Sequence, residues 1–187
     1  MTRVLVLQGP NLNLVGTREP EIYGYETLEE IHAGIAKRGT ELGLQTDFFQ
    51  SNHEGALIDR LHRRDFDVAI VNAGGLTHTS VSLRDALLAV QRPFIEVHLS
   101  DPSRREPFRH VNFLHDVALE SIVGQGARGY HLALESIGQS EATLGQRGNL
   151  LSPAVAPAED TLLRPAAKSV DQPPEQLLRS SDQADTG

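Results

Sequence analysis

Cysteine is absent from the 187 residues of the chain, and lysine is nearly absent. Without thiols, disulfide bonds, thiolate nucleophiles and cysteine-ligated metal sites are excluded. The only lysines are Lys37, in a predicted surface helix, and Lys168, in a polar C-terminal segment. Neither position suits the buried amine that forms a Schiff base with a carbonyl substrate. The sequence therefore argues against covalent catalysis through sulfur or lysine.

Patterns that hold a metal or a cofactor are equally scarce. The eight histidines show neither His-x-x-x-His nor His-Glu-x-x-His spacing. The run GQGARG at residues 124–129 matches a dinucleotide-binding pattern, but it follows the last predicted strand, and no later β-α unit completes a nucleotide fold. We interpret this run as a tight turn and expect neither a metal nor a cofactor.

Charge and hydropathy exclude two further classes of partner. The formal net charge is −8, and no block rich in lysine or arginine offers an electrostatic footprint for nucleic acid or anionic lipid. No apolar run approaches the roughly 20 residues of a membrane span, and the short run at residues 4–7 lacks the features of a signal peptide. We expect a cytoplasmic protein that binds neither nucleic acid nor membrane.

Short apolar runs alternate with helical patterns over residues 1–138. A capping box, TLEE at residues 27–30, introduces the first helix. This alternation is typical of right-handed β-α-β crossovers and of a parallel sheet covered on both faces. We predict an α/β fold, a flavodoxin-like doubly wound five-stranded parallel sheet with strand order 2-1-3-4-5. The predicted strands are residues 4–7, 46–50, 68–71, 94–97 and 121–123, and the predicted helices are residues 28–42, 54–64, 80–90 and 128–137.

The composition changes beyond Gln139. Five of the ten prolines lie in residues 139–187, which contain no aromatic residue and no histidine. Such a composition buries too little apolar surface to fold. We therefore predict one folded domain at residues 1–138, which holds the candidate site described below, and a disordered, proline-rich acidic tail at residues 139–187. The leucine pairs of this tail, at 162–163 and 177–178, are either solvated or weak docking points for a partner.

Polar side chains follow three of the predicted strands. In a parallel sheet, ligands bind outside the carboxyl ends of the strands, where these residues meet. They are Asn11 and Asn13 after the first strand, Asn72 and His78 after the third, and His98 and Ser100 after the fourth.

His98 is the candidate for proton transfer at this edge. Its imidazole changes charge near physiological pH, so it can act as an acid or a base. Glu96 lies two residues earlier, and the alternation of side chains along a strand places both on the same face, where the carboxylate can orient the imidazole. The alternative is a histidine with a structural role only.

The long loop over residues 9–24 carries a second candidate, Tyr23. A tyrosine base must lower its pKa from about 10 by roughly three units to work near neutrality. Arg18, on the same loop, provides a positive charge that stabilises the phenolate when the loop excludes water. The alternative is that both side chains only hold the loop in place.

Three further residues are candidates for ligand binding. His78 either faces the ligand or serves as a neighbour of the helix cap at Ser80. Asp85 accepts hydrogen bonds from a ligand hydroxyl or from Arg84, or lies on a solvated helix face. Arg109, with Arg104 and Arg105, forms a basic cluster suited to a small carboxylate, or is simply solvated. The chemistry that remains is proton abstraction followed by loss of water or isomerisation.

Several motifs together resemble the type II 3-dehydroquinate dehydratases over residues 3–138. They stand in the order and approximate spacing of that family. The motifs are GPNLNL at residues 9–14, GTREP at 16–20 with Tyr23-Gly24, THTS at 77–80 with LRDAL at 83–87, EVHLS at 96–100 and REPFRH at 105–110.

The resemblance implies a flavodoxin-like subunit, a homododecamer of trimers, and conversion of 3-dehydroquinate to 3-dehydroshikimate and water without cofactor or metal. Tyr23 would then remove a proton from C2, Arg18 would stabilise its anionic form, and Asn11 would help hold a water against the resulting enolate. His98, oriented by Glu96, would protonate the departing C1 hydroxyl. The substrate-binding residues would be Asn72, His78, Asp85, Leu99, Ser100 and Arg109.

Two stretches depart from the family pattern. NAGGL at residues 72–76 replaces a common Asn-Pro-Gly-Ala-Tyr, and Asp101 follows Ser100 where an asparagine is common. A carboxylate near the ligand's own carboxylate would weaken substrate affinity. The alternative function is a non-catalytic member of the fold that binds a hydroxylated acid and uses its tail to contact another protein. The same reaction serves both the shikimate pathway of aromatic biosynthesis and quinate catabolism.

Overall fold

The computed structural model describes residues 1–17 and 25–146, with side chains described up to residue 140. Within them a five-stranded parallel sheet has the order β2-β1-β3-β4-β5, as predicted. The strands are β1 (Arg3–Gln8), β2 (Gln45–Gln50), β3 (Val68–Asn72), β4 (Phe94–His98) and β5 (Glu120–Val123), and the α-helices are α2 (Leu28–Glu41), α3 (Glu54–His62), α4 (Val81–Val90) and α5 (Arg128–Gln146).

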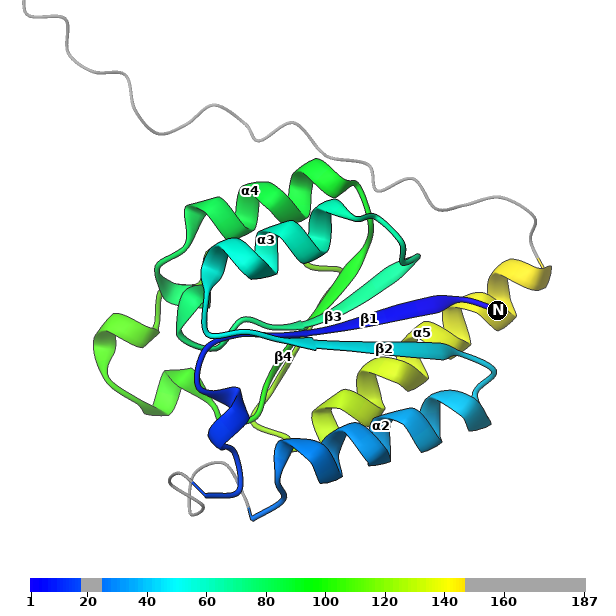
Figure 1. Cartoon of the computed structure of the whole chain (residues 1–187), viewed down its shortest axis with the longest axis horizontal. Helices are drawn as coiled ribbons and strands as arrows, with labels where there is room; N and C mark the ends of the chain where they lie inside the picture. The colour runs from blue at the N-terminus through cyan, green and yellow to red at the C-terminus, as the bar shows by residue number, and fades with distance from the viewer. Residues whose placement is uncertain (18–24, 147–187) are drawn as a thin grey trace, which may run out of the picture. The chain divides into compact units, whose positions relative to one another are not determined.

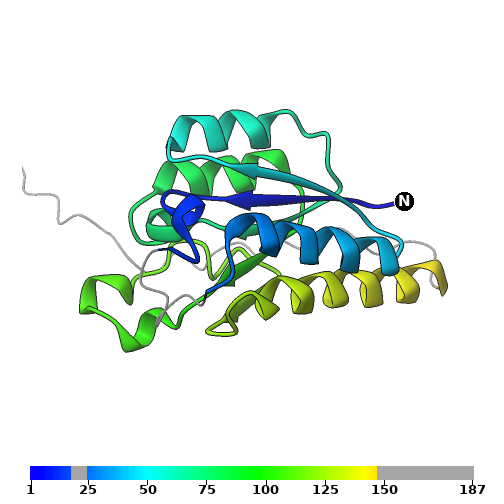
Figure 2. The same cartoon turned by 60° about the horizontal axis from the view of Figure 1, so that its bottom comes forward.

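The sheet separates two hydrophobic clusters. Figure 1 shows α3 and α4 on one face and α2 and α5 on the other, and the turned view of Figure 2 confirms that α2 and α5 run side by side. Successive residues of β1 serve opposite faces, because side chains alternate along a strand. Val4 and Val6 pack in the cluster under α2 and α5, whereas Leu5 and Leu7 pack in the cluster under α3 and α4.

Capping residues explain where the helices begin. The Thr27 side chain accepts a hydrogen bond from the Glu30 backbone, and the Glu30 carboxylate accepts one from the Thr27 backbone, so the predicted capping box is confirmed. The Ser80 side chain accepts from the Leu83 backbone at 2.8 Å and starts α4. Both caps satisfy backbone donors that the first turn of a helix leaves unpaired.

The last helix is longer than predicted. It was expected to end near residue 137, with the tail starting at 139, but α5 continues to Gln146. Residues 139–146 contain no proline, since the prolines of the C-terminal segment start at Pro153. The helix thus ends later than predicted, and residues 147–187 of the predicted tail lie outside the described residues. Among the described helices, none is long and apolar enough to cross a membrane.

Candidate active site

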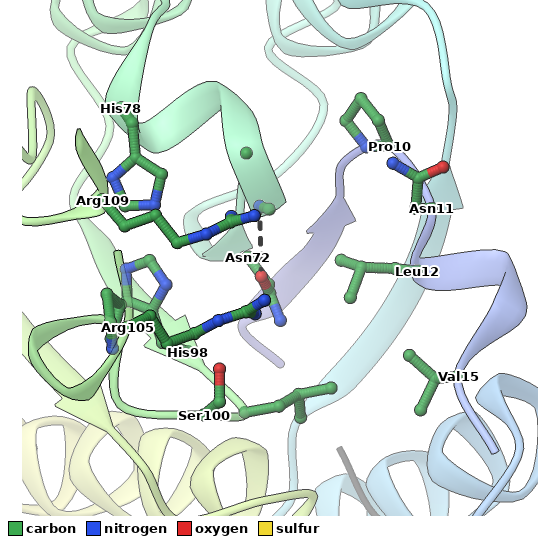
Figure 3. A pocket seen from close by; sticks show the side chains of 14 residues that line it. Pro10, Asn11, Leu12, Val15, Asn72, His78, His98, Ser100, Arg105 and Arg109 are labelled. Carbon is green, nitrogen blue, oxygen red and sulfur yellow. Dashed lines mark hydrogen bonds between the residues drawn. The ribbon is translucent and has the colours of Figure 1, made fainter. Parts of the chain in front are cut away.

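A cavity of about 230 Å³ lies beyond the carboxyl ends of β1, β3 and β4. The chain leaves β1 toward α2 on one face of the sheet and leaves β3 toward α4 on the other, so the two neighbouring strands open a crevice between their loops. The cavity occupies this switch point (Figure 3). Its lining residues are Pro10, Asn11, Leu12, Val15, Asn72, Gly74, Gly75, His78, His98, Leu99, Ser100, Pro102, Arg105 and Arg109.

Two glycines allow the loops after β1 and β3 to touch. A Cβ on Gly9 would lie 2.2 Å from the backbone oxygen of Ala73, closer than any side chain can approach. Gly74 has a φ of +58° and a Cβ there would lie 3.1 Å from the backbone oxygen of Pro10. Asn11 also adopts a left-handed conformation, with φ at 68°, and its backbone N–H donates to Asn52 Oδ1 at 2.8 Å. The tight contact fixes one wall of the cavity.

Glu96 and His98 form the predicted pair. His98 Nε2 lies 2.8 Å from Glu96 Oε1, and a carboxylate oxygen accepts, so Nε2 carries the proton. Glu96 is fully buried and His98 is 6% exposed, at the cavity wall. Because Nε2 is engaged by Glu96, Nδ1 is the ring atom left for a ligand.

Several neutral donors complete the surroundings of the Glu96 carboxylate. Thr77 Oγ1 donates at 3.0 Å, Asn112 Nδ2 donates to both oxygens at 3.0 and 2.9 Å, and Ser121 Oγ donates at 2.8 Å. Burial on its own would raise the pKa of this carboxyl, but the hydrogen bond and charge of His98, with the bonds from Asn112 and Ser121, lower it to about 2. Glu96 is therefore an anion at neutral pH and accepts the hydrogen bond from His98 Nε2.

His78 lines the cavity from the 3-10 helix after β3 (Gly74–His78). Its Nδ1 lies 2.6 Å from the backbone oxygen of Val111, so Nδ1 donates and Nε2 remains available as an acceptor. Asn72, Leu99 and Ser100, which are ligand-binding candidates from the sequence, also line the cavity. The GQGARG run is the expected turn: Gly124 and Gly126 have positive φ, and their N–H groups donate to the backbone oxygens of His98 and Leu99.

The basic cluster divides into two parts. Arg105 and Arg109 line the cavity, whereas the Arg104 side chain is 86% exposed and pairs with Asp101. Arg109 donates from Nε to Glu106 Oε2 at 2.7 Å and lies 5.3 Å from the centre of the Phe108 ring. Figure 3 shows both cavity arginines beside His98 and His78. These guanidinium groups give the cavity a positive side suited to a carboxylate.

Asp101 does not line the cavity. Its Oδ1 accepts from the backbone N–H and the hydroxyl of Ser103, at 2.9 and 2.7 Å, and so caps the 3-10 helix Pro102–Arg104. These bonds, with the nearby charge of Arg104, lower the pKa of Asp101. The Asp101 carboxylate is bonded to Ser103 and is not among the residues that line the cavity, so its position does not support the expected repulsion of a ligand carboxylate.

Among the described residues, the candidates Asp85 and Asn13 do not line the cavity. Asp85 is exposed on α4, and Arg84 is paired with Asp116 and bonded to the Phe113 carbonyl rather than to Asp85. Arg18 and Tyr23 lie outside the described residues. Asn13, which also follows β1, is exposed and does not line the cavity.

The sequence alone did not assign Thr77, Asn112 or Ser121 to the site. Thr77 was recognised only as part of a motif. Asn112 lies in an irregular segment and Ser121 in the last strand, where no periodic pattern connects them with Glu96. Across the described residues, no group of three or more histidine, aspartate or glutamate side chains is arranged to hold a metal ion.

Comparisons with known proteins agree with this geometry. A family model described as dehydroquinase class II matches residues 2–138. A 3-dehydroquinate dehydratase of Sodalis glossinidius is 54% identical over 135 residues, which cover 71% of this chain and 90% of the relative. The 3-dehydroquinate dehydratase 1 of Ralstonia nicotianae is 56% identical over 137 residues, covering 72% of this chain and 88% of the relative.

Solved structures give the same result for the fold. A type II dehydroquinase from Butyrivibrio crossotus superposes with a TM-score of 0.71 at 39% identity, covering 73% of this chain and 97% of that one. A type II dehydroquinase from Propionibacterium acnes has the same TM-score at 34% identity, covering 74% and 97%.

Proposed function

The chain belongs to the class II dehydroquinases, and on that premise we propose that it converts 3-dehydroquinate to 3-dehydroshikimate and water, with Tyr23 as base and His98 as acid. The observation that carries the proposal is the buried Glu96–His98 pair, which presents an imidazole to a cavity whose other side holds two arginines. A hydro-lyase acting on a carboxylic acid needs a proton donor for the leaving hydroxyl and a cation for the carboxylate.

The first step takes a proton from C2, next to the C3 ketone. The Tyr23 phenolate removes it, and the electron pair of the broken C–H bond moves to the C3 oxygen to form an enolate. In this proposal the positive charge of Arg18 favours the phenolate of Tyr23. Asn11, at the cavity wall, helps hold a water that donates to the enolate oxygen.

The second step releases water. As the enolate collapses, the C1–C2 double bond forms, the C1–oxygen bond breaks, and His98 protonates the departing hydroxyl. Glu96 supports this step because it is ionised and fixes the ring through Nε2, leaving Nδ1 toward the cavity. Before the next turnover the imidazole takes up a proton and the Tyr23 phenol releases the one it took from C2, both by exchange with solvent.

Substrate recognition follows the polarity of the cavity. Arg109 binds the carboxylate together with the backbone and hydroxyl of Ser100 and the backbone of Leu99, while Asn72 and His78 bind ring hydroxyls. Asp85 reaches a substrate only from a neighbouring subunit, which fits its exposure on α4 and the proposed homododecamer. We place the enzyme in the cytoplasm and in the shikimate pathway or in quinate catabolism.

The experiment is a direct assay. Purified protein is mixed with 3-dehydroquinate, and the absorbance of the conjugated enone product is followed with and without a chelator. We expect the same rate in both, since the proposed steps involve only side chains, solvent and substrate. A folded protein that binds quinate by calorimetry but forms no enone would refute the dehydratase and favour a binding protein.

A further inference from the structure

The Tyr130 hydroxyl is buried behind the cavity, in contact with two amide side chains. Tyr130 lies in the first turn of α5 and has no solvent exposure. Its hydroxyl oxygen accepts from Gln8 Nε2 at 3.1 Å and from Asn72 Nδ2 at 3.0 Å. Gln8 and Asn72 are register partners at the carboxyl ends of β1 and β3. One phenol therefore links the last residues of the two strands that open the crevice.

Asn72 is the only member of this trio that lines the cavity. Its Oδ1 accepts from the Gly74 backbone at 3.2 Å, the bond drawn in Figure 3, while its Nδ2 donates to Tyr130. A side-chain amide has two N–H donors and two lone pairs on oxygen, so one donor and one lone pair remain for a ligand. The two bonds together fix the orientation of the amide, with Nδ2 toward Tyr130 and Oδ1 toward the Gly74 N–H.

We propose that Tyr130 is a positioning residue for substrate binding, whose hydroxyl holds the Asn72 amide in the orientation that presents its second N–H to a substrate hydroxyl. The inference deepens the proposed function, because it assumes that Asn72 binds the substrate. Tyr130 itself does not touch the cavity and acts only through Asn72.

Gln8 and His32 keep the Tyr130 end of this arrangement in place. His32 Nε2 lies 2.5 Å from Gln8 Oε1, so the histidine donates and the Gln8 amide N–H is directed at Tyr130. The His32 ring stacks on Phe48 with centroids 4.3 Å apart. Burial lowers the pKa of His32, so the neutral ring with its proton on Nε2 is favoured at neutral pH.

Tyr130 is not a second base. Burial raises the pKa of its hydroxyl, an effect that the hydrogen bonds from Gln8 and Asn72 oppose but do not overcome. The group stays a neutral phenol during turnover, and its contribution is the direction of the hydrogen bond from Asn72.

Phenylalanine at position 130 tests this role, because it keeps the ring and removes only the acceptor. In Tyr130→Phe the Asn72 and Gln8 donors lose their buried partner, and the Asn72 amide is free to turn. We expect KM for 3-dehydroquinate and Kd for quinate to rise roughly tenfold, equal to about 1.4 kcal/mol, with kcat within about twofold. Tyr25→Phe is the matched control, since Tyr25 is 78% exposed, and it should change neither value.

A double-variant comparison separates positioning from general stability. In an Asn72→Ala background, Tyr130→Phe should raise KM no further, because the residue it positions is gone. Equal effects of Tyr130→Phe with and without Asn72, or an unchanged KM in the single variant, would overturn the proposal. A wild-type protein that forms no product refutes the proposed function instead, and the quinate affinities of the four proteins then still test the positioning role.

Should Tyr130→Phe fail to fold, fluorinated tyrosines at position 130 replace it. Ring fluorination weakens the hydroxyl oxygen as an acceptor while nearly keeping its size. KM should then rise with the number of fluorine atoms at a constant kcat, and a KM that does not respond to fluorination contradicts the role.

Discussion

His98 Nε2 lies 2.8 Å from Glu96 Oε1, and the two side chains come from the same strand, two residues apart. The carboxylate has no solvent exposure, and its other bonds come from neutral donors. Its charge is therefore directed at the imidazole.

Glu96→Gln should remove the negative charge that accepts the His98 Nε2–H while preserving the shape of the side chain. We expect kcat for enone formation to fall by at least roughly 100-fold, as when the carboxylate behind a catalytic histidine is replaced by an amide. Ser121→Ala is the control: it removes one hydrogen bond to the same carboxylate but not the charge, and should cost less than roughly tenfold. Equal losses in the two variants would show that the charge is not what matters.

Acid should weaken the fold through the same carboxyl. The pKa of Glu96 is lowered from its ordinary 4.5 to about 2. The stabilisation is therefore fully present above about pH 4.5 and is lost as the pH falls toward 2. A shift of this size corresponds to about 3 kcal/mol.

Chemical denaturation of the wild type and Glu96→Gln at several pH values between 6 and 2.5 measures this effect. The free energy of unfolding should fall more steeply with acid in the wild type, so that the gap between the two proteins narrows. Parallel curves would mean that Glu96 titrates normally in the folded protein.

Gly9→Ala should disrupt the contact between the loops after β1 and β3. The added Cβ would lie 2.2 Å from the Ala73 backbone oxygen, so the backbone must move. We expect a loss of about 2 kcal/mol or more in the free energy of unfolding and a raised KM. Gly55→Ala is the matched control, since a Cβ there meets nothing within 4 Å and Gly55 lies in α3; it should be neutral or stabilise by about 0.5–1 kcal/mol. Similar unfolding curves for both variants would show that the close contact between Gly9 and the Ala73 backbone does not require glycine at position 9.

Removal of residues 147–187 should leave kcat and KM within about twofold of the full chain. The family match ends at residue 138, and α5 continues to Gln146, so a truncation after Gln146 keeps the whole helix. The assay is enone formation by the two proteins at equal concentration. A large loss of activity in a folded truncated protein would assign the C-terminal segment a role in catalysis.

The regular elements and the hydrogen bond between Glu96 and His98 were predictable because their signals are local. The capping box at residues 27–30 and the apolar runs of the strands act over a few residues, and the spacing of Glu96 and His98 follows from strand geometry. The helix–strand alternation then limits the topology to few choices. The structure confirms the sheet order and brings Asn72, His78 and His98 to one cavity.

The remaining features depend on non-local or irregular structure. Asn112 and Ser121 donate hydrogen bonds to Glu96 from 16 and 25 residues further along the chain. No periodic pattern in the segment between β4 and β5 predicts these two bonds. Arg104 and Arg105 are neighbours, yet a 3-10 turn directs only one to the cavity. The end of α5 was misjudged because prolines marked the tail, and they begin seven residues beyond the helix.

Hydrogen exchange at C2 of the substrate tests most directly whether Tyr23 is the base and His98 the acid. Tyr23→Phe and His98→Ala are each incubated with 3-dehydroquinate in deuterated water, and the recovered substrate is analysed for deuterium at C2. We predict that neither variant forms appreciable enone, that His98→Ala still exchanges the C2 hydrogen through the enolate, and that Tyr23→Phe does not. Exchange by Tyr23→Phe, or its absence in a His98→Ala protein that still binds the substrate, would contradict the assignment.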